Sequence, residues 1–369
     1  MKIALVSREY PLTSGSGGIG TYTYNLAHAL VAHGHEVHVI TRSNKTRKKD
    51  KKVLLHTIKH NDCFCSNIRY SCKVAKILRK EKFDIVQASE WGGEAYIFSL
   101  FKNAPLVTRF ATPTYMINRL NNQKDVGFLT LHMERAQAKH SNALFSSTHA
   151  LAEVIAVDWK INIEKIKVIP NSIELKNITN QKTKQLFGKD YILYFGRLEE
   201  RKGMITLAKA LSGVFKKYPD IKVVLAGKDM SYRNAKMSDY IKEKNKKYLK
   251  NIIFTGDLKK DKMYSVIAAS QLVVLPSRWE AFGFVCLEAL AFGKVTIATK
   301  GSGFSEIIED SVSGYLVNPD KPKELTQKII HCLSNDMSLI RRNARARSKR
   351  FSVENISKQV LELYENMVK

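Results

Sequence analysis

The segment PSRWEAFGFVCLEALAFG, in the second half of the chain, contains two glutamates eight residues apart. A buried strand, LVVL, is expected to end just before it, which places Glu280 in a loop and Glu288 about one turn into a helix that begins near Gly283. The unpaired amides of Phe284 and Val285 at the helix N-terminus, together with the helix dipole, favour a phosphate group. The glycine lets the backbone approach such an anion closely. The segment therefore predicts a site for a phosphate-bearing ligand.

A second segment, FGRLEERKG, follows the predicted strand YILY and supplies cations. Arg197 and Lys202 would project from the loop at the strand's carboxyl end, where two cations can clamp a diphosphate and stabilise its charge as it leaves. Each motif also has a structural interpretation, with Glu280 as a helix-start acid and the two cations as solvated loop charges. Taken alone, neither motif decides between the two interpretations.

The elements that must position these residues alternate between strand and helix along nearly the whole chain. IALVS, TYTYNLAHALVAHG and EVHVIT indicate strand, helix and strand, and the alternation starts again at YILYFG after a polar, linker-like stretch. Such alternation implies parallel sheets covered on both faces, which is the α/β class. We therefore expect two doubly wound, Rossmann-like domains facing each other across a cleft, with ligands beyond the carboxyl ends of the strands.

The net charge indicates anionic partners. The chain of 369 residues has 61 Lys and Arg against 34 Asp and Glu, a formal net charge of +27, and basic runs occupy residues 42–52, 231–250 and 341–350. Phosphate-bearing substrates, anionic lipid or nucleic acid would match this charge, and solvated lysine-rich faces are the alternative. The runs are not interleaved with aromatic residues in the manner of a single-strand stacking platform, which disfavours nucleic acid.

Cysteine usage and hydropathy bear on the compartment. Five cysteines, an odd number, argue against a disulfide framework and for a reducing environment. The cluster Cys63, Cys65 and Cys72 lies near His56 and His60, but its spacing fits no standard structural zinc pattern, so we predict no metal site. Charged residues come too early for a signal peptide, and no apolar run approaches the roughly 18 residues that span a bilayer. We expect a cytoplasmic protein, either soluble or peripheral on the inner face of the membrane.

In this order and at this separation, the motifs resemble those of the retaining glycosyltransferases of family 4, which have the GT-B fold. The resemblance covers essentially the whole chain: the N-terminal glycine loop, VIPNSIE, GRLEERKG, the segment with the two glutamates, GSGFSEII, SGYLV and the closing FSVENISKQVLELYENMV. In such enzymes, two glutamates with seven residues between them form the signature acid motif.

The resemblance implies roles for these positions. Arg197 and Lys202 would hold the diphosphate of a UDP-, GDP- or ADP-sugar, Glu280 would lie beside the donor sugar, and these three are the candidate catalytic residues. Glu288 would accept hydrogen bonds from the ribose hydroxyls. Further donor contacts are expected from the two glycine-containing loops, at Gly17, Gly18, Phe282, Gly283, Phe284 and Val285.

The resemblance also divides the chain. It implies an acceptor-side Rossmann-like domain at 1–172, a nucleotide-sugar-binding domain at 173–350, and a C-terminal helix at 351–369 that crosses back to the first domain. Glu90 and Trp91 follow the predicted strand FDIVQAS and, with Arg109, are candidate acceptor-site residues. The structural alternative for this stretch is a helix N-terminus with a packed tryptophan.

The function that follows is transfer of a sugar, with retention, from a nucleotide-diphosphate donor to a glycan or lipid-linked acceptor. No carboxylate of the motifs is an obvious nucleophile, which favours same-face displacement with the departing diphosphate helping to remove the acceptor proton. The paired cations would replace a metal ion, and no cofactor beyond the donor is expected. The alternatives are a sugar-nucleotide epimerase on the same fold and a non-catalytic basic protein that binds nucleic acid or membrane.

Some positions depart from the family pattern. Ala111 stands where members often have a histidine that contacts the donor sugar, and Arg109 or Glu90 could substitute for it. Ser172 and Glu174 replace the usual glycine and aspartate at the hinge, and Lys294 replaces a common proline, a change expected to have little effect. The loop GSGGIG, at 15–20, fits the dinucleotide fingerprint literally, but REYPLTS separates it from the strand, and we interpret the match as coincidental.

Overall fold

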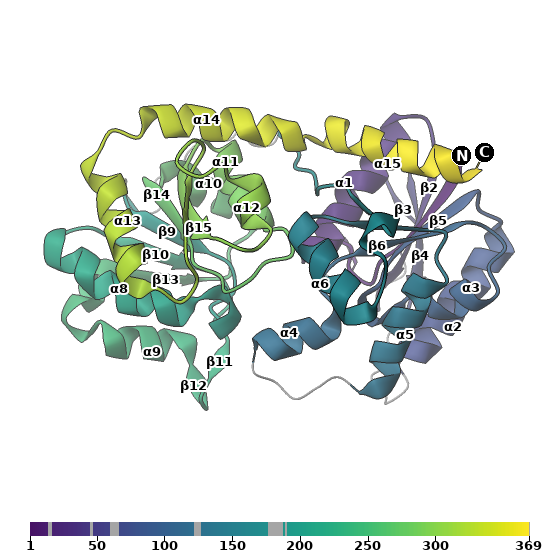
Figure 1. Ribbon diagram of the computed structural model, residues 1–369, viewed down its shortest axis with the longest axis horizontal. Helices are drawn as coiled ribbons and strands as arrows, with labels where there is room; N and C mark the ends of the chain where they lie inside the picture. Colours follow the sequence, from purple (N-terminus) through teal and green to yellow (C-terminus); the bar gives the residue numbers. More distant parts are fainter. Residues whose placement is uncertain are drawn as a thin grey trace. The chain divides into compact units, whose positions relative to one another are not determined.

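The computed structural model describes residues 1–13, 17–44, 47–59, 66–121, 127–175, 187–188 and 190–368. They form two compact units: unit 1 contains Met1–Ile173 and Phe351–Lys369, and unit 2 contains Glu174–Arg350. Each unit is a parallel sheet with helices packed against it, so the α/β class expected from the alternation is confirmed (Figure 1). Most of the expected linker lies outside the described residues.

Unit 1 is built on an eight-stranded sheet of order β3-β4-β2-β1-β5-β6-β7-β8. Its strand pairs are parallel except for β3 with β4. The strands are β1 (Lys2–Val6), β2 (Glu36–Arg42), β3 (Lys49–Asp50), β4 (Val53–Ile58), β5 (Ile85–Ser89), β6 (Leu106–Phe110), β7 (Ala143–Ser146) and β8 (Ile166–Val168).

Both faces of this sheet carry helices. They are α1 (Gly18–Ala32), α2 (Ser66–Glu81), α3 (Tyr96–Leu100), α4 (Thr114–Leu120), α5 (Phe128–Lys139), α6 (His149–Trp159) and α15 (Val353–Val368). The apolar sides of α2 and α3 share a core with alternate residues of β1 and β5, such as Val6 and Val86. On the opposite face, α15 contacts β5 through Tyr364, whose hydroxyl donates to Gln87 Oε1 at 2.6 Å.

Unit 2 is built on a six-stranded parallel sheet of order β13-β10-β9-β14-β15-β16. The strands are β9 (Ile192–Phe195), β10 (Val223–Ala226), β13 (Ile252–Gly256), β14 (Leu272–Leu275), β15 (Val295–Thr299) and β16 (Tyr315–Val317), and a small hairpin adds β11 (Ser231–Tyr232) and β12 (Ala235–Lys236). The helices are α8 (Met204–Lys217), α9 (Met237–Lys244), α10 (Lys260–Ala269), α11 (Phe284–Ala291), α12 (Phe304–Ile307), α13 (Pro322–Ser334) and α14 (Ser338–Ser348).

The strand orders fix where each unit can bind a ligand. In unit 1 the order reverses between β1 and β5, and in unit 2 it reverses between β9 and β14. At such a switch point, the loops leaving two adjacent strands run to opposite faces of the sheet and leave room between them for a ligand. Among the described residues, no helix is long and apolar enough to cross a bilayer.

Candidate active site

The candidate active site of unit 2 lies where the loops after β9 and β14 meet. The first loop passes through a short 3-10 helix, Glu200–Lys202, and enters α8 at Gly203, which has φ +73°. A Cβ at Gly203 would lie 1.8 Å from the carbonyl oxygen of Pro276, so only glycine allows the loops to approach this closely. The Arg278 amide donates to the Arg201 carbonyl at 2.9 Å and joins the two loops.

Lys202 and Glu280, 78 residues apart in sequence, form an ion pair at this junction. Ser277 Oγ donates to the same carboxylate oxygen of Glu280 at 2.8 Å, and Arg201 Nη1 lies 4.0 Å from the other oxygen. Burial by itself raises the pKa of the Glu280 carboxyl, but Lys202, Arg201 and Ser277 outweigh it and hold the pKa below its ordinary value. Burial lowers the pKa of Lys202, and Glu280 opposes that shift. We therefore interpret the pair as ionised near neutral pH.

A second carboxylate positions the remaining cations. Glu199 Oε1 lies 2.8 Å from Arg201 Nη2 and 3.4 Å from Arg197 Nη2. The Arg197 side chain is 50% exposed, whereas that of Arg201 is 8% exposed, so Arg197 is the cation that a ligand can reach most easily. Our sequence reasoning missed Glu199, Arg201 and Ser277. The available signal was the close alternation of acidic and basic residues in RLEERK.

The helix α11 begins at the same place. Its N-cap residue, Gly283, has φ +105° and makes no side-chain cap hydrogen bond. A Cβ there would lie 2.3 Å from the ring of Phe304, which explains the glycine. The Gly303 amide donates to the Glu280 carbonyl at 2.9 Å and thereby holds the loop that contains Glu280. The helix N-terminus with Phe284 and Val285 thus lies in the same loop cluster as Glu280.

Glu288 lies on α11, half-buried. Burial raises its pKa to about 7, and the charge of Lys260 on α10 opposes the shift. Its carboxyl therefore changes protonation near neutral pH, whereas that of Glu280 stays ionised.

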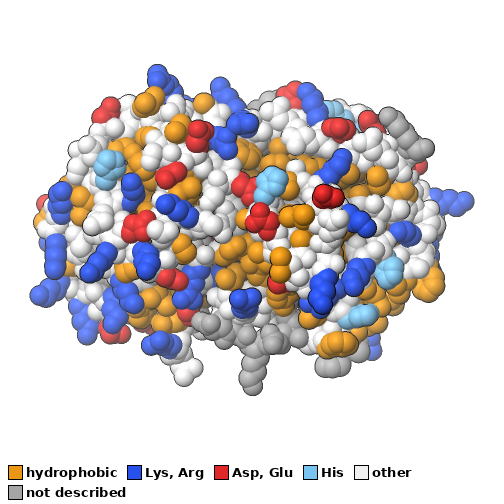
Figure 2. All heavy atoms as spheres, viewed as in Figure 1, with side chains coloured by type: hydrophobic (Ala, Val, Ile, Leu, Met, Phe, Trp, Pro, Cys, Tyr) orange, Lys and Arg blue, Asp and Glu red, His pale blue; other side chains and the backbone are white. Residues whose placement is uncertain are grey.

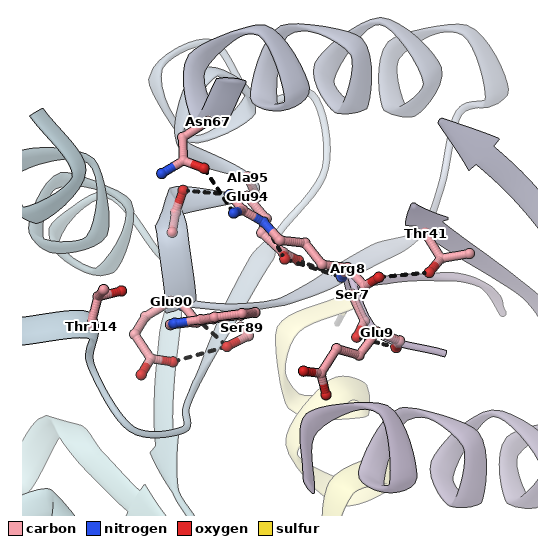
Figure 3. A network of polar contacts seen from close by, with 12 residues as sticks. Ser7, Arg8, Glu9, Thr41, Asn67, Ser89, Glu90, Glu94, Ala95 and Thr114 are labelled. Carbon is pink, nitrogen blue, oxygen red and sulfur yellow. Dashed lines mark hydrogen bonds and ion pairs between the residues drawn. The ribbon is translucent and has the colours of Figure 1, made fainter. Parts of the chain in front are cut away.

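The switch point of unit 1 holds a different network, shown in Figure 3. Arg8, in the loop after β1, lies 2.8 Å from Glu94 Oε1 through Nε and donates to the Gly92 carbonyl through Nη2 at 2.9 Å. Its Nη1 donates to Asn67 Oδ1 at 2.8 Å. Gly92 has φ +69°, and a Cβ there would lie 2.5 Å from the Arg8 guanidinium. The loops after β1 and β5 are thus held together by one buried arginine.

The three candidate acceptor residues lie in or beside this network. Glu90 is fully buried and accepts hydrogen bonds from the Ala111 amide at 2.8 Å and from Ser89 Oγ at 3.1 Å, and burial raises its pKa to about 8. Arg109 is 3% exposed, its Nη2 donates to Asn171 Oδ1 at 2.7 Å, and its guanidinium lies 3.9 Å from the Tyr22 ring centroid. The half-buried Trp91 has the Arg8 guanidinium 5.7 Å from its ring centroid. The contacts of Glu90 and Arg109 are thus with unit 1 itself.

The described part of the glycine loop is occupied by a side chain. The amides of Gly17 and Gly20 donate to Glu9 Oε2 at 3.0 and 3.3 Å, at the start of α1. A Cβ at Gly17 would lie 2.4 Å from the same oxygen. Gly18 is the first residue of α1. Glu9 therefore occupies the position at this helix N-terminus that an anionic ligand would take.

The structure shows the contacts made at two positions that depart from the family pattern. At Ala111, the backbone amide binds Glu90, which lies beside the turn where a histidine was expected. At Lys294, Nζ donates to the carbonyls of Ala268 and Ser270 at 2.6 and 2.8 Å, so the lysine terminates α10 and does more than add a charge.

The cysteine and histidine cluster considered for a metal lies partly outside the described residues. Within the described ranges, no three His, Cys, Asp or Glu side chains lie close enough to hold a metal ion. His60, Cys63 and Cys65 lie outside those ranges. His56 Nε2 lies 2.8 Å from His38 Nδ1, and Cys72 is exposed on α2.

Comparison with known proteins agrees with the fold. Residues 16–177 match the family described as Glycosyltransferase Family 4, and residues 177–350 match the family described as Glycosyl transferases group 1. An uncharacterised glycosyltransferase of Methanocaldococcus jannaschii is 25% identical over 99% of this chain and 98% of its own length. A glycogen synthase of Mycobacterium tuberculosis is 24% identical over 95% of this chain and 90% of its own length.

Solved structures share the fold. A sucrose-phosphate synthase from Thermosynechococcus elongatus aligns with a TM-score of 0.81, 20% identity and coverage of 99% of this chain and 98% of that chain. HepE from Anabaena, in complex with UDP-glucose, aligns with a TM-score of 0.76, 20% identity and coverage of 99% and 100%. The fold and the two family matches define a glycosyltransferase of the GT-B type. The chain belongs to the glycosyltransferases of family 4.

Proposed function

We propose that the chain transfers a sugar from a nucleotide-diphosphate donor to a glycan or lipid-linked acceptor, with retention at the anomeric carbon. The observation that carries this proposal is the contact between Lys202 and Glu280, with Arg197 and Arg201 beside it, at the switch point of unit 2. Open α/β sheets bind ligands at such points, and clustered cations suit a diphosphate. HepE, which binds UDP and UDP-glucose, supports a nucleotide sugar as donor.

In the proposed reaction, the bond between the anomeric carbon and the leaving phosphate oxygen breaks, and its electron pair stays on the diphosphate. The acceptor hydroxyl oxygen forms the new bond on the same face, and its proton passes to the departing diphosphate. Arg197 and Lys202 would stabilise the charge that develops on the leaving group. Their charge would do the work of a metal ion, so we expect turnover to persist in excess EDTA.

The remaining groups would orient the donor. Glu280, held by Lys202 and Ser277, would contact the donor sugar, and Glu288 would bind the ribose hydroxyls. The N-terminus of α11, whose N-cap residue is Gly283, would receive sugar and phosphate oxygens through the amides of residues 282–285. At the start of α1, a diphosphate near Gly17 and Gly18 would have to displace the Glu9 carboxylate.

The test begins with the donor. Thermal unfolding is measured with UDP, GDP and ADP and then with the matching nucleotide sugars, because a ligand that binds only the folded state raises its stability. Donor turnover is then followed with a labelled sugar on a panel of oligosaccharide and lipid-linked acceptors. The variants are Lys202→Ala and Glu280→Ala, and Lys209→Ala, on the exposed side of α8, is the control.

The proposal predicts that Lys202→Ala and Glu280→Ala lose transfer while Lys209→Ala keeps it. Undiminished transfer by both site variants would overturn the assignment of this site. Incubation of the wild-type protein with donor alone addresses the reaction type. An isomerised sugar nucleotide formed without acceptor would indicate an epimerase and contradict the proposed transfer.

A further inference from the structure

Helix α2 has a basic stripe that the linear charge runs do not reveal. Arg69, Lys73, Lys76 and Lys80 follow the helical repeat along one face, and all four are exposed. The opposite face packs into the core of unit 1 through Tyr70, Val74, Ala75 and Leu78. Among the described residues, no carboxylate forms an ion pair with any of the four stripe residues, so their charge is directed to solvent.

Exposed apolar side chains lie near both ends of this stripe. Phe101, directly after α3, is 69% exposed, and the Arg79 guanidinium near the end of α2 lies 5.7 Å from its ring centroid. Phe128, the first residue of α5, is 85% exposed. The start of α5 adjoins the start of α2, because Asn67 Nδ2 donates to Thr130 Oγ1 at 3.1 Å. At about 1.5 Å per residue, the stripe from Arg69 to Lys80 spans about 17 Å along the axis of α2, and an aromatic ring lies near each end of it.

The carboxylates of these helices lie away from this surface. Glu94, between α2 and α3 in sequence, and Glu134, on α5, are buried, and Glu81 at the end of α2 lies 3.4 Å from Lys2 Nζ. In Figure 1, α2, α3 and α5 lie side by side. Figure 2 shows basic, histidine and hydrophobic side chains gathered over the lower part of this region, where no acidic side chain is seen. The surface is therefore positively charged and partly apolar.

The basic run at 341–350 contrasts with this stripe. Arg345 Nη2 donates to the Phe292 carbonyl at 3.4 Å, and Arg347 donates to the carbonyls of Ile307 and Glu306 at 3.1 and 2.9 Å. These arginines hold α14 against the ends of other elements of unit 2. A linear charge run is thus a poor guide to which cations can meet an anionic partner.

We propose that the α2 surface, defined by Arg69, Lys73, Lys76, Lys80, Phe101 and Phe128, docks unit 1 on an anionic lipid bilayer. Basic residues are attracted to anionic headgroups, and exposed aromatic rings partition into the interface between headgroups and acyl chains. A bilayer matches both features at once, because it offers a continuous negative surface and an apolar layer beneath it over the length of α2. Docking is peripheral and reversible, since it relies on charge and two aromatic side chains.

The experiment measures cosedimentation of the full chain with vesicles, without donor or acceptor, so its outcome does not depend on the proposed enzymatic activity. Vesicles of phosphatidylcholine alone are compared with vesicles that contain phosphatidylserine, over a salt series. The basic variant is Arg69→Gln/Lys73→Gln/Lys76→Gln/Lys80→Gln, and the apolar variant is Phe101→Ser/Phe128→Ser. The matched control removes four exposed lysines from unit 2: Lys244→Gln/Lys246→Gln/Lys247→Gln/Lys250→Gln.

The wild type is expected to bind the anionic vesicles and to be released as salt screens the charges. Each basic residue near such a surface contributes roughly a factor of five in affinity, so the basic variant should bind several hundredfold more weakly. The apolar variant should bind more weakly as well, and its residual binding should be more sensitive to salt. The control should bind within a few fold of the wild type.

The proposal is overturned if the basic variant binds as well as the wild type or if the control loses as much affinity as the basic variant. It is also overturned if the wild type ignores vesicles but retains a salt-sensitive, stripe-dependent affinity for duplex DNA, or if sedimentation equilibrium shows that the stripe joins two copies of the chain. All the substituted side chains are exposed, so each variant is expected to fold. Circular dichroism and thermal unfolding verify this.

Discussion

In unit 2, the loops after β9 and β14 gather Arg197, Arg201 and Lys202 around the carboxylates of Glu199 and Glu280. In unit 1, the loop after β5 holds the buried carboxyls of Glu90 and Glu94, and among the described residues Arg8 from the loop after β1 forms an ion pair with Glu94. Both places are the switch point of a doubly wound parallel sheet. The same topology therefore supports a cluster of cations in one unit and a cluster of buried carboxyls in the other. The side chains on the loops determine which cluster forms.

The pKa directions express this difference. In unit 2 the neighbouring cations hold the pKa of Glu280 below its ordinary value in spite of burial. In unit 1 burial dominates, and it raises the pKa of Glu90 to about 8 and that of Glu94 to about 7. A charged cluster with an exposed Arg197 suits an anionic substrate, whereas buried, hydrogen-bonded carboxyls suit the fixing of loops.

The largest expected effect is on turnover in unit 2. Lys202→Met should lower donor turnover by about 100- to 1,000-fold, because it removes a cation from the site where negative charge develops. Glu280 keeps contacts with Arg201 and Ser277, so the variant should fold. Steady-state kinetics measure the effect, and Lys209→Met on the exposed side of α8 is the control. A loss of less than tenfold would mean that this cluster is structural, like that of unit 1.

The corresponding change in unit 1 should affect stability. Arg8→Met leaves the Glu94 carboxylate buried without its partner, which should cost about 3–5 kcal/mol of unfolding free energy. Urea denaturation measures the loss, and Arg69→Met, on the exposed face of α2, should change it by less than about 0.5 kcal/mol. Turnover per folded molecule should stay close to the wild-type value. A stable Arg8→Met enzyme with lost turnover would contradict the contrast between the two units.

The pH dependence of stability should separate the two clusters. Because the pKa of Glu90 is raised to about 8 in the folded state, folding retains a proton that the unfolded chain releases near pH 4.5, and stability falls as pH rises between these values. One such group gives a slope of at most about 1.4 kcal/mol per pH unit. Glu90→Gln should therefore flatten the urea-derived stability profile over this window.

Glu280→Gln should act with the opposite sign. Its pKa is lowered in the folded state, so its contribution is present above the unfolded value and is lost as pH falls through the folded value. The unfolding free energy of the variant should therefore decrease less steeply in acid than that of the wild type. Glu354→Gln, an exposed substitution on α15, is the control for both measurements. If the unfolding free energies of the two site variants depended on pH in the same way, the proposed electrostatic difference between the two units would be contradicted.

The smallest expected effect concerns the helix starts. The Glu9 carboxylate caps α1 by accepting hydrogen bonds from the amides of Gly17 and Gly20. Glu9→Ala should cost about 0.5–2 kcal/mol of unfolding free energy, as the loss of an N-terminal cap usually does. Gly17→Ala should cost a similar amount, since its Cβ would displace the same carboxylate.

A double-mutant cycle sharpens this last prediction. Glu9→Ala and Gly17→Ala should be non-additive, because each removes the same contact. Gly127→Ala at the start of α5 is the control, as a Cβ there meets none of the described residues within 4 Å. Additive losses in the cycle would mean that the Glu9 contact does not stabilise α1.

Much of the fold was predictable from local pattern. The alternation of apolar strands with helical-period segments predicted two parallel α/β units, and the fold class and the family resemblance are confirmed. The functional roles of Arg197, Lys202, Glu280 and Glu288 remain predictions. The structure shows that Lys202 and Glu280 meet, which their positions in the sequence do not reveal.

The parts that the sequence did not predict depend on contacts between distant segments. Arg201 acts on Glu280 only because β14 pairs beside β9, and the close approach at Gly203 is visible only once Pro276 is placed. The basic stripe of α2 was missed because its residues are spread over twelve positions and converge only on a helix.

The sequence by itself thus determined the class of elements, their order and the family, because periodicity and short motifs are local properties of the chain. Tertiary structure decided which charges are paired, which are buried and which face solvent. Arg197 and Arg201 have the same side chain four residues apart, yet one is half exposed and the other is enclosed. That difference follows from burial and from long-range pairing, which no single segment of the chain contains.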